Sequence, residues 1–332
     1  MDNRNLTTKE KILSMLVSHN DYVSGQEICD SLSLSRTAVW KHIKSLKSAG
    51  YEIDSVNNRG YKLVSAPDIM DEMHIREHLH TKWMAGNIVY LPETDSSNIQ
   101  AKRLGESGAE NGTVVVTDKQ TAGRGRRGRG WISPSGNCYF SILLYPDVRV
   151  ERASMITLVA AMAVAKAVRE AEGLETMIKW PNDVVVNGKK ICGILTESST
   201  DLEYIQYVVV GIGINCNQTE FDNEIIKMAT SIRLETKKEV DRAKLLAKFF
   251  DCFEKYYDIF MKTEDLSELS AAYNELLINK GREVKIIEKD TERVLKAVGI
   301  NSKGGLIVEN MDGSQETIIS GEVSVRGLYG YV

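Results

Sequence analysis

The chain has 332 residues, of which 42% are hydrophobic and 27% charged, with a formal net charge of −4 at pH 7. This length suits two or three domains, and the acidic balance excludes a protein that binds nucleic acid over its whole surface, so any such role needs a local basic patch. There is no bilayer-spanning apolar run, no signal peptide and no Cys-x-x-Cys pair among the five cysteines, so we expect a cytoplasmic protein with reduced thiols and no membrane contact.

Residues 1–65 predict a winged helix-turn-helix domain. Their apolar spacing indicates three short helices, and the third, over residues 35–49, carries four Lys or Arg side chains and no acid. The alternating segments 51–56 and 61–64 flank a turn and predict a two-stranded wing. A small helical protein-interaction domain with a solvated basic face is the alternative interpretation.

DNA binding is the function that the helices, the wing and the charge of this domain jointly favour. The third helix is expected to enter a major groove, while the wing tip reaches the backbone. The side chains predicted to lie near bases or phosphates are Arg36, Thr37, Lys41, His42 and Arg59.

A proline-containing segment at residues 65–68 marks the start of the next domain. Residues 71–80 then predict a helix in which His74 and His78 have the spacing of metal ligands. No third ligand follows, so we interpret this segment as a solvent-facing helix end and expect no protein metal site.

A turn rich in hydroxyl and amide groups, residues 93–98, follows the next predicted strand. Ser96, Ser97 and Asn98 precede a helix expected over residues 99–105. Ser96 or Ser97 can cap that helix, and the same groups can hydrogen-bond a neutral polar ligand. Both roles can hold at once.

The stretch 123–130 carries four glycines and four arginines and no acid. Glycine lets a backbone approach a ligand closely, and arginine offers a fork of donors that matches carboxylate or phosphate. We therefore predict a mobile loop that closes over an anion. Its G-x-G-x-x-G pattern is not followed by a helix, which a dinucleotide site requires. A solvated segment or a non-specific RNA contact is the alternative.

The central part of the chain predicts a mixed, largely antiparallel sheet covered by helices. Strands are expected on both sides of the loop, and the Asn187-Gly188 pair between two apolar runs is a strong hairpin signal. This pattern does not fit a doubly wound nucleotide fold. There is no P-loop motif. No histidine occurs after His80, and no serine, cysteine and histidine set suggests covalent catalysis.

Four motifs in this part, at residues 120–128, 179–183, 188–195 and 211–215, together with the helix-turn-helix, resemble the BirA family of bacterial bifunctional biotin–protein ligases and biotin operon repressors. The resemblance covers nearly the whole chain. It implies an α+β multidomain protein. The winged domain is expected to be followed by a class II-synthetase-like mixed-sheet catalytic domain over residues 66–279. An SH3-like β-barrel is expected over 280–332, where short β runs end in the family's closing motif.

The resemblance implies two half-reactions. Biotin's carboxylate attacks the α-phosphate of ATP, giving biotinyl-5′-AMP, and a lysine of a biotin carboxyl carrier protein then attacks that mixed anhydride. Mg²⁺ is expected to be held mainly by the nucleotide phosphates. The resemblance further implies that the adenylate is the corepressor. It is expected to favour a homodimer that pairs two helix-turn-helix units on operator DNA.

The resemblance also assigns residues to the ligand. Those expected to bind biotin or its adenylate are Ser96, Ser97, Asn98, Gln120, Arg124, Gly125, Arg126, Trp131, Lys190, Gly193 and Asn215. Two anions must meet, so Arg126 and Lys190 are expected to be catalytic as fixed cations. Asp183 is a third candidate, as a contact to the attacking lysine, unless it is only a hydrogen-bonded turn carboxylate.

Two other functions remain open from the sequence. One is a transcription regulator that binds biotin or biotinyl-AMP but has lost transfer, which the intact Arg124, Arg126 and Lys190 oppose. The other is a lipoate ligase, which the glycine–arginine loop disfavours.

Overall fold

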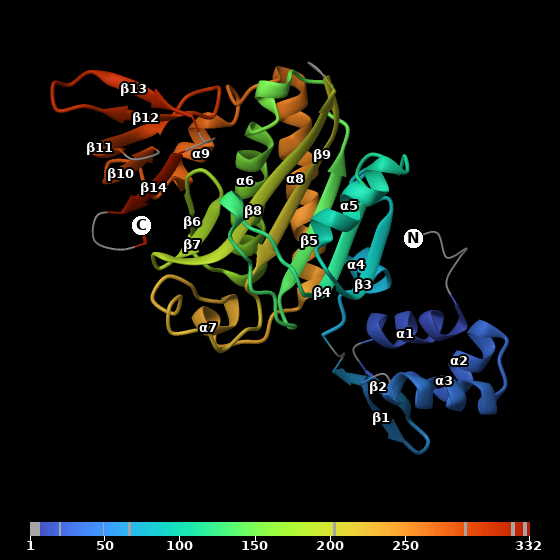
Figure 1. Cartoon of the computed structure of the whole chain (residues 1–332). Coiled ribbons are helices and arrows are strands. Elements are labelled where there is room, and N and C mark those ends of the chain that lie inside the picture. The colour runs from blue at the N-terminus through green and yellow to red at the C-terminus, as the bar shows by residue number, and fades with distance from the viewer. Residues whose placement is uncertain are drawn as a thin grey trace. The chain divides into compact units, whose positions relative to one another are not determined.

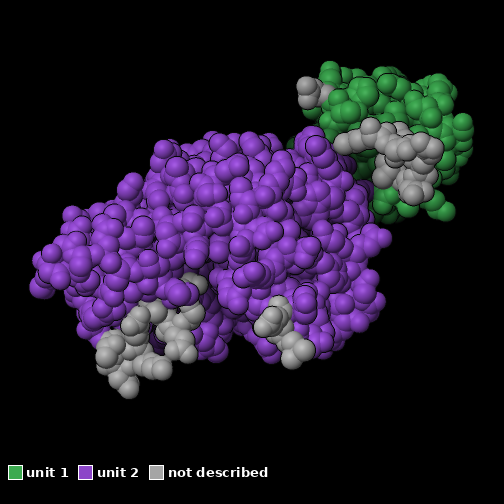
Figure 2. All heavy atoms as spheres, turned by 90° about the horizontal axis from the view of Figure 1, so that it is seen from above, with its two compact units in different colours: residues 1–69 green, residues 70–332 purple. Residues whose placement is uncertain are grey.

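The computed structural model describes the chain except for residues 1–6, 20, 49, 66–67, 202–203, 289–290, 320–322 and 328–330. The chain divides into two compact units, residues 1–69 and 70–332, which Figure 2 colours separately. The predicted linker positions 66–67 and the first two residues of the predicted closing motif, 321–322, lie outside the described residues.

The first unit has the helix and strand order of the predicted winged domain (Figure 1). Its elements are α1 (Thr8–Ser18), α2 (Gly25–Leu32), α3 (Arg36–Ser48), β1 (Glu52–Val56) and β2 (Gly60–Ser65), the last two pairing antiparallel. Val23 and Tyr61 exchange backbone hydrogen bonds of 2.8 and 2.9 Å and attach the wing to the helices. Gly60 has φ +107°, and an added Cβ would lie 2.0 Å from the Val23 carbonyl oxygen, so this close approach requires glycine.

The second unit is built on a mixed seven-stranded sheet with the strand order β3-β4-β5-β9-β8-β7-β6. The strands are β3 (Ile88–Thr94), β4 (Val114–Gln120), β5 (Cys138–Leu144), β6 (Thr176–Lys179), β7 (Asp183–Val186), β8 (Lys189–Asp201) and β9 (Tyr204–Ile214). Only β3 and β4 pair parallel; the other neighbours are antiparallel, as predicted. The predicted Asn187-Gly188 hairpin joins β7 to β8.

Helices cover both faces of this sheet because its buried strands are apolar on both sides (Figure 1). The helices are α4 (Glu72–His78), α5 (Ser97–Glu106), α6 (Met155–Glu172), α7 (Ile232–Thr236), α8 (Arg242–Thr263) and α9 (Ser270–Leu276). Val114 and Val116 belong to the large core shared with α6 and α8. Val115, between them, packs with Ala101 of α5 on the opposite face.

Two local expectations were wrong. His74 was expected at a solvent-facing helix end, but it is buried, and its Nδ1 lies 2.6 Å from an Asp71 carboxylate oxygen. Ser96 occupies the N-cap position of α5 but makes no capping hydrogen bond through its side chain. Both positions are determined by tertiary structure. His74 is buried in the interior, and the start of α5 lines the smaller cavity described below.

The last part of the second unit is a five-stranded antiparallel sheet with the order β13-β12-β11-β10-β14. Its strands are β10 (Glu283–Glu288), β11 (Thr291–Ile300), β12 (Leu306–Glu309), β13 (Gln315–Ile318) and β14 (Val323–Gly327). It is joined to the large sheet by Trp180, whose buried Nε1–H donates to the Gly304 carbonyl at 3.0 Å. Among the described residues, no helix has the length and apolarity needed to cross a membrane.

Glu254 on α8 fixes the segment that leads into β3. Its carboxylate is buried and accepts the backbone N–H groups of Lys82, Trp83 and Met84 at 2.9 Å each.

Replacing Glu254 by alanine leaves these donors buried without acceptors. We expect Glu254→Ala to lower the free energy of unfolding by roughly 2–4 kcal/mol, measured by urea denaturation. Lys255→Ala, at the exposed neighbouring position, serves as the control and is expected to cost less than about 0.5 kcal/mol. Equal stability of the two variants would contradict this role.

Candidate active site

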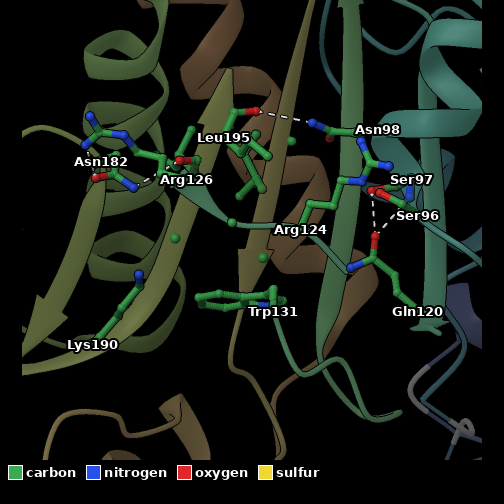
Figure 3. Close-up of a pocket in the computed structure, with 16 residues that line it drawn as sticks. Ser96, Ser97, Asn98, Gln120, Arg124, Arg126, Trp131, Asn182, Lys190 and Leu195 are labelled. Carbon is green, nitrogen blue, oxygen red and sulfur yellow. Dashed lines mark hydrogen bonds between the residues drawn. The ribbon is translucent and has the colours of Figure 1, made fainter. Parts of the chain in front are cut away.

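Two adjoining cavities lie on the large sheet beside the glycine–arginine loop. The smaller, about 60 Å³, is drawn in Figure 3, and the larger is about 580 Å³. Both are lined by Gly125, Arg126, Trp131, Asn182 and Lys190. A ligand with two parts can therefore place one part in each cavity and its linkage among these five residues.

The predicted ligand-binding residues are distributed unevenly between the cavities. Ten line the smaller cavity, namely Ser96, Ser97, Asn98, Gln120, Arg124, Gly125, Arg126, Trp131, Lys190 and Gly193. Asn215 does not reach it and lines the larger cavity, as does Asp183. The residues predicted to bind one ligand thus lie in two adjoining compartments.

One end of the smaller cavity is a network of neutral polar groups at the start of α5. The Gln120 Oε1 atom accepts the backbone N–H of Ser97 at 2.9 Å and its hydroxyl at 3.2 Å. The buried Ser141 hydroxyl lies 2.8 Å from Ser97 Oγ and 2.6 Å from Asn98 Oδ1. This end offers hydroxyl and amide groups, which suit a neutral polar ligand head.

Asn98 is fixed from two directions. Its Nδ2 donates to Glu197 Oε2 at 2.7 Å, and Lys102 Nζ lies 2.5 Å from the other carboxylate oxygen. On the opposite side, a Cβ added to Gly211 would lie 1.9 Å from Asn98 Oδ1, so only glycine fits there. Burial acts to raise the pKa of Glu197, but the hydrogen bonds from Lys102 and Asn98 outweigh it and lower that pKa overall.

The glycine–arginine loop folds back on itself as a short hairpin beyond β4. Trp131 N–H donates to the Gly123 carbonyl at 2.9 Å, and Gly125 N–H to the Arg129 carbonyl at 2.8 Å. A single helical turn, η1 (Arg126–Gly128), forms the tip. Figure 3 shows that the indole of Trp131 lies between the Gln120 side and the Lys190 side of the smaller cavity.

Two glycines make room for that indole. A Cβ on Gly193 would lie 2.9 Å from the Trp131 ring, and one on Gly213 would lie 2.7 Å from its Nε1 atom. The buried Nε1 has no hydrogen-bond partner. The floor of the cavity is therefore bare backbone, and a side chain or a flat ligand can lie directly on it.

Arg126 and Lys190 stand where the cavities meet. Arg126 Nη1 donates to Asn182 Oδ1 at 3.1 Å, and Asn182 in turn donates to the Ile194 carbonyl at 3.1 Å. Lys190 Nζ lies 2.6 Å from Asp183 Oδ1 and 4.9 Å from the centre of the Trp131 ring. Burial lowers the pKa of Arg126, opposed by Asp183, but a guanidinium stays charged at any physiological pH. The junction thus holds two cations against one carboxylate.

Three residues of this site were missed from the sequence. Asn182 lies inside the motif at residues 179–183 but was assigned no role, although it accepts a hydrogen bond from Arg126. Glu197 gave no signal, since its partner Asn98 is 99 positions away. Tyr331, whose hydroxyl donates to Asp183, lies 148 positions away and outside all the motifs.

The described residues contain no group of three or more His, Cys, Asp or Glu side chains placed to hold a metal ion. The larger cavity is lined by one carboxylate, Asp183. A divalent ion would thus have to bring most of its own ligands, such as phosphate oxygens.

In the first unit, the exposed face of α3 is basic and aromatic. Thr37 and Lys41 are exposed, whereas His42 is half-exposed and Arg36 donates to Gln26 at 3.0 Å. Arg59 lies over the Tyr22 ring, 4.3 Å from its centre. Trp40, which was missed, is 54% exposed and lies one residue from Lys41. Lys44 Nζ lies 5.2 Å from the centre of the Trp40 ring, so this exposed indole lies beside a cation on the same face.

Comparison with known proteins places the two units in families. Residues 8–62 match a model described as an HTH domain, residues 90–215 the Biotin/lipoate A/B protein ligase family, and residues 281–326 the Biotin protein ligase C terminal domain. The chain is 38% identical over 313 residues to the bifunctional ligase/repressor BirA of Bacillus subtilis. This match covers 93% of this chain and 96% of that protein.

The chain belongs to the BirA family. It is also 29% identical over 316 residues to the bifunctional ligase/repressor BirA of Escherichia coli, covering 95% of this chain and 96% of that relative. Among solved structures it resembles the biotin protein ligase from Aquifex aeolicus in complex with biotin and ATP, with a TM-score of 0.64 and 35% identity over 73% of this chain and 99% of that one. The predicted resemblance to the BirA family is confirmed.

The hydrogen bonds that Glu197 accepts from Asn98 and Lys102 predict that its contribution to the free energy of unfolding depends on pH. Because its pKa is lowered in the folded protein, Glu197 stabilises the fold above its unfolded pKa, and this stabilisation is lost as the pH falls through the folded value. We expect Glu197→Gln to be less stable than the parent at neutral pH. The difference should shrink as the pH falls below about 4.3.

Urea denaturation of both proteins across this pH range checks the prediction. Glu220→Gln, which changes an exposed carboxylate, is the matched control. A stability difference for Glu197→Gln that stays constant from neutral to acidic pH would contradict it.

Proposed function

We propose that this protein is a biotin–protein ligase that also represses biotin genes. It forms biotinyl-5′-AMP from biotin and ATP and transfers biotin to a lysine of a biotin carboxyl carrier protein. The observation that carries the proposal is the meeting of two cavities at Arg126 and Lys190 in a chain of the BirA family. This arrangement suits a ligand made of two parts joined by an acyl phosphate.

In the first half-reaction, we assign biotin to the smaller cavity and ATP to the larger. The hydroxyl and amide groups of Ser97, Asn98 and Gln120 suit the neutral ring system of biotin, with Ser96, Arg124, Gly125 and Gly193 completing the walls. Asn215 lies in the larger cavity, where adenine belongs. Arg126 and Lys190 lie between and offset the charge of the carboxylate and the α-phosphate as the two approach.

Mg²⁺ fits this site as a companion of the nucleotide. With Asp183 as the one carboxylate lining the larger cavity, the phosphate oxygens would supply most of its ligands. When bound, it would withdraw charge from the phosphates.

The loop acts as a lid in this proposal. Trp131 lies on bare backbone at Gly193 and Gly213, and a ligand that takes this floor must share it with the indole. With the ligand bound, the loop covers the mixed anhydride and keeps water from it.

Repression is assigned to the first unit. Arg36, Thr37, Lys41, His42 and Arg59, joined by Trp40, form the proposed DNA surface. Adenylate binding favours a homodimer, which presents two recognition helices to one operator. We divide the chain into a DNA-binding domain (1–65), a class II-synthetase-like catalytic domain (66–279) and an SH3-like domain (280–332). All five cysteines are buried free thiols, which supports a cytoplasmic location.

The function is tested by incubating the protein with ATP, labelled biotin and a biotin carboxyl carrier domain. Label on the carrier lysine is expected. Adenylate formation without transfer would leave a regulator, and transfer of lipoate instead of biotin would contradict the proposal.

Arg126 is predicted to retain the adenylate. Arg126→Gly should release biotinyl-AMP into solution about 10–100-fold faster, because a charge-assisted contact is lost. Arg149→Gly is the matched control, since Arg149 is exposed and lines neither cavity. Filter-binding release rates distinguish the two. Equal retention by both variants would contradict the role of Arg126.

DNA binding is predicted to tighten when biotin and ATP are added together, measured on the promoter of the organism's biotin genes. Lys41→Ala should weaken binding and lower the slope of log affinity against log salt by about 1, as expected for one phosphate contact. Lys166→Ala, on the second unit, should leave that slope unchanged. A DNA affinity that does not change when biotin and ATP are added would contradict the proposed switch.

A further inference from the structure

Tyr331 contacts the reaction site from a part of the chain to which no role has been given. Its hydroxyl donates to Asp183 Oδ2, and Lys179 Nζ lies 3.4 Å from the centre of its ring. The following residue, Val332, lies near Gly188 at the β7–β8 turn. Tyr331 also lines the larger cavity. Tyr331 therefore contacts both ends of the motif at residues 179–183 and also lines the cavity assigned to ATP.

Asp183 has a different partner on each oxygen. Lys190 Nζ lies 2.6 Å from Oδ1, and the Tyr331 hydroxyl holds Oδ2. In the proposed reaction Lys190 must turn to the acyl phosphate, so its hold on Oδ1 weakens when ligand binds. Tyr331 has no such competing demand. It remains as the contact that can keep the carboxylate in place.

We propose that Tyr331 is a positioning residue for the transfer half-reaction, holding Asp183 by one oxygen so that the other faces the incoming carrier lysine. This inference rests on the proposed ligase function. The Tyr331 phenol stays protonated and able to donate, since burial and the Asp183 charge raise its pKa well above the ordinary value.

The transfer step shows what Asp183 must do. The lysine arrives as an ammonium and gives one proton to the free oxygen of Asp183. The amine nitrogen then bonds to the acyl carbon, the carbon–oxygen bond to the phosphate breaks, and AMP leaves with that electron pair. A second proton leaves the nitrogen for water as the amide forms, and Asp183 returns its proton to water. A carboxylate that rotates freely would meet the ammonium less often.

The test separates the two half-reactions in the full-length protein. Tyr331→Phe removes one oxygen and keeps the ring beside Lys179. We expect the rate of adenylate formation, measured by the release of pyrophosphate, to stay within about twofold of the parent. The single-turnover rate of transfer to a carrier domain should fall about tenfold. Tyr204→Phe, on an exposed tyrosine of β9, is the matched control and should change neither rate.

Hydroxylamine distinguishes the positioning role from a merely structural role, because structural damage would slow the reaction with both nucleophiles, whereas loss of positioning slows only the carrier lysine. It is uncharged at neutral pH and can attack the adenylate without first losing a proton. Its reaction with adenylate bound to Tyr331→Phe should therefore match the parent. Equal slowing with hydroxylamine and with the carrier would overturn the proposal, as would unchanged carrier transfer.

A double-mutant cycle tests whether Tyr331 acts through Asp183. In an Asp183→Asn background, Tyr331→Phe should cost no further transfer rate. Independent, multiplying losses would contradict the positioning role. Failure of the parent protein to form adenylate would refute the ligase function itself. An active parent with an unaffected Tyr331→Phe variant would refute this inference alone.

Discussion

The site depends on two cations, Arg126 and Lys190, held close together by partners that a ligand can replace. Arg126 donates to the neutral amide oxygen of Asn182, and Asp183 pairs with Lys190 at 2.6 Å. Like charges in a partly buried site repel, so the Asp183 carboxylate, which pairs with Lys190 and also favours the charged form of Arg126, lowers the cost of assembling the site. Biotin's carboxylate and the α-phosphate bring the same sign of charge as Asp183. Ligand binding can therefore exchange one anionic partner for another.

The fold supplies the precision that this exchange needs. Lys190 follows a tight hairpin on β8, and Arg126 belongs to a loop whose backbone closes on itself beyond β4. The glycines at 193, 211 and 213 remove side chains from the floor, so the neighbouring Asn98 and Trp131 approach the strands directly. Lys190 and the glycine floor of the site thus lie on strands, and Arg126 and Trp131 lie on the loop that we propose acts as the lid.

Sequence reasoning recovered the helix-turn-helix, the mixed sheet and most residues of the smaller cavity. It succeeded where the signal is local, as in the basic helix that Ser35 caps and the Asn187-Gly188 hairpin. It failed for His74, because burial depends on what packs against a helix, and for Ser96, which lines the smaller cavity and makes no capping hydrogen bond. Tyr331 and Glu197 could not be found, since each meets its partner only after the chain has folded and neither carries a motif.

The central claim is that the two cavities hold one ligand whose linkage lies at Lys190. Calorimetric titration with biotin and with a non-hydrolysable biotinyl-AMP analogue, on the parent protein and on Lys190→Ala, tests it most directly. The account predicts that Lys190→Ala weakens the analogue at least about tenfold more than it weakens biotin, because Lys190 is a charge-assisted partner of the acyl phosphate. Equal weakening of both ligands, or none, would contradict it.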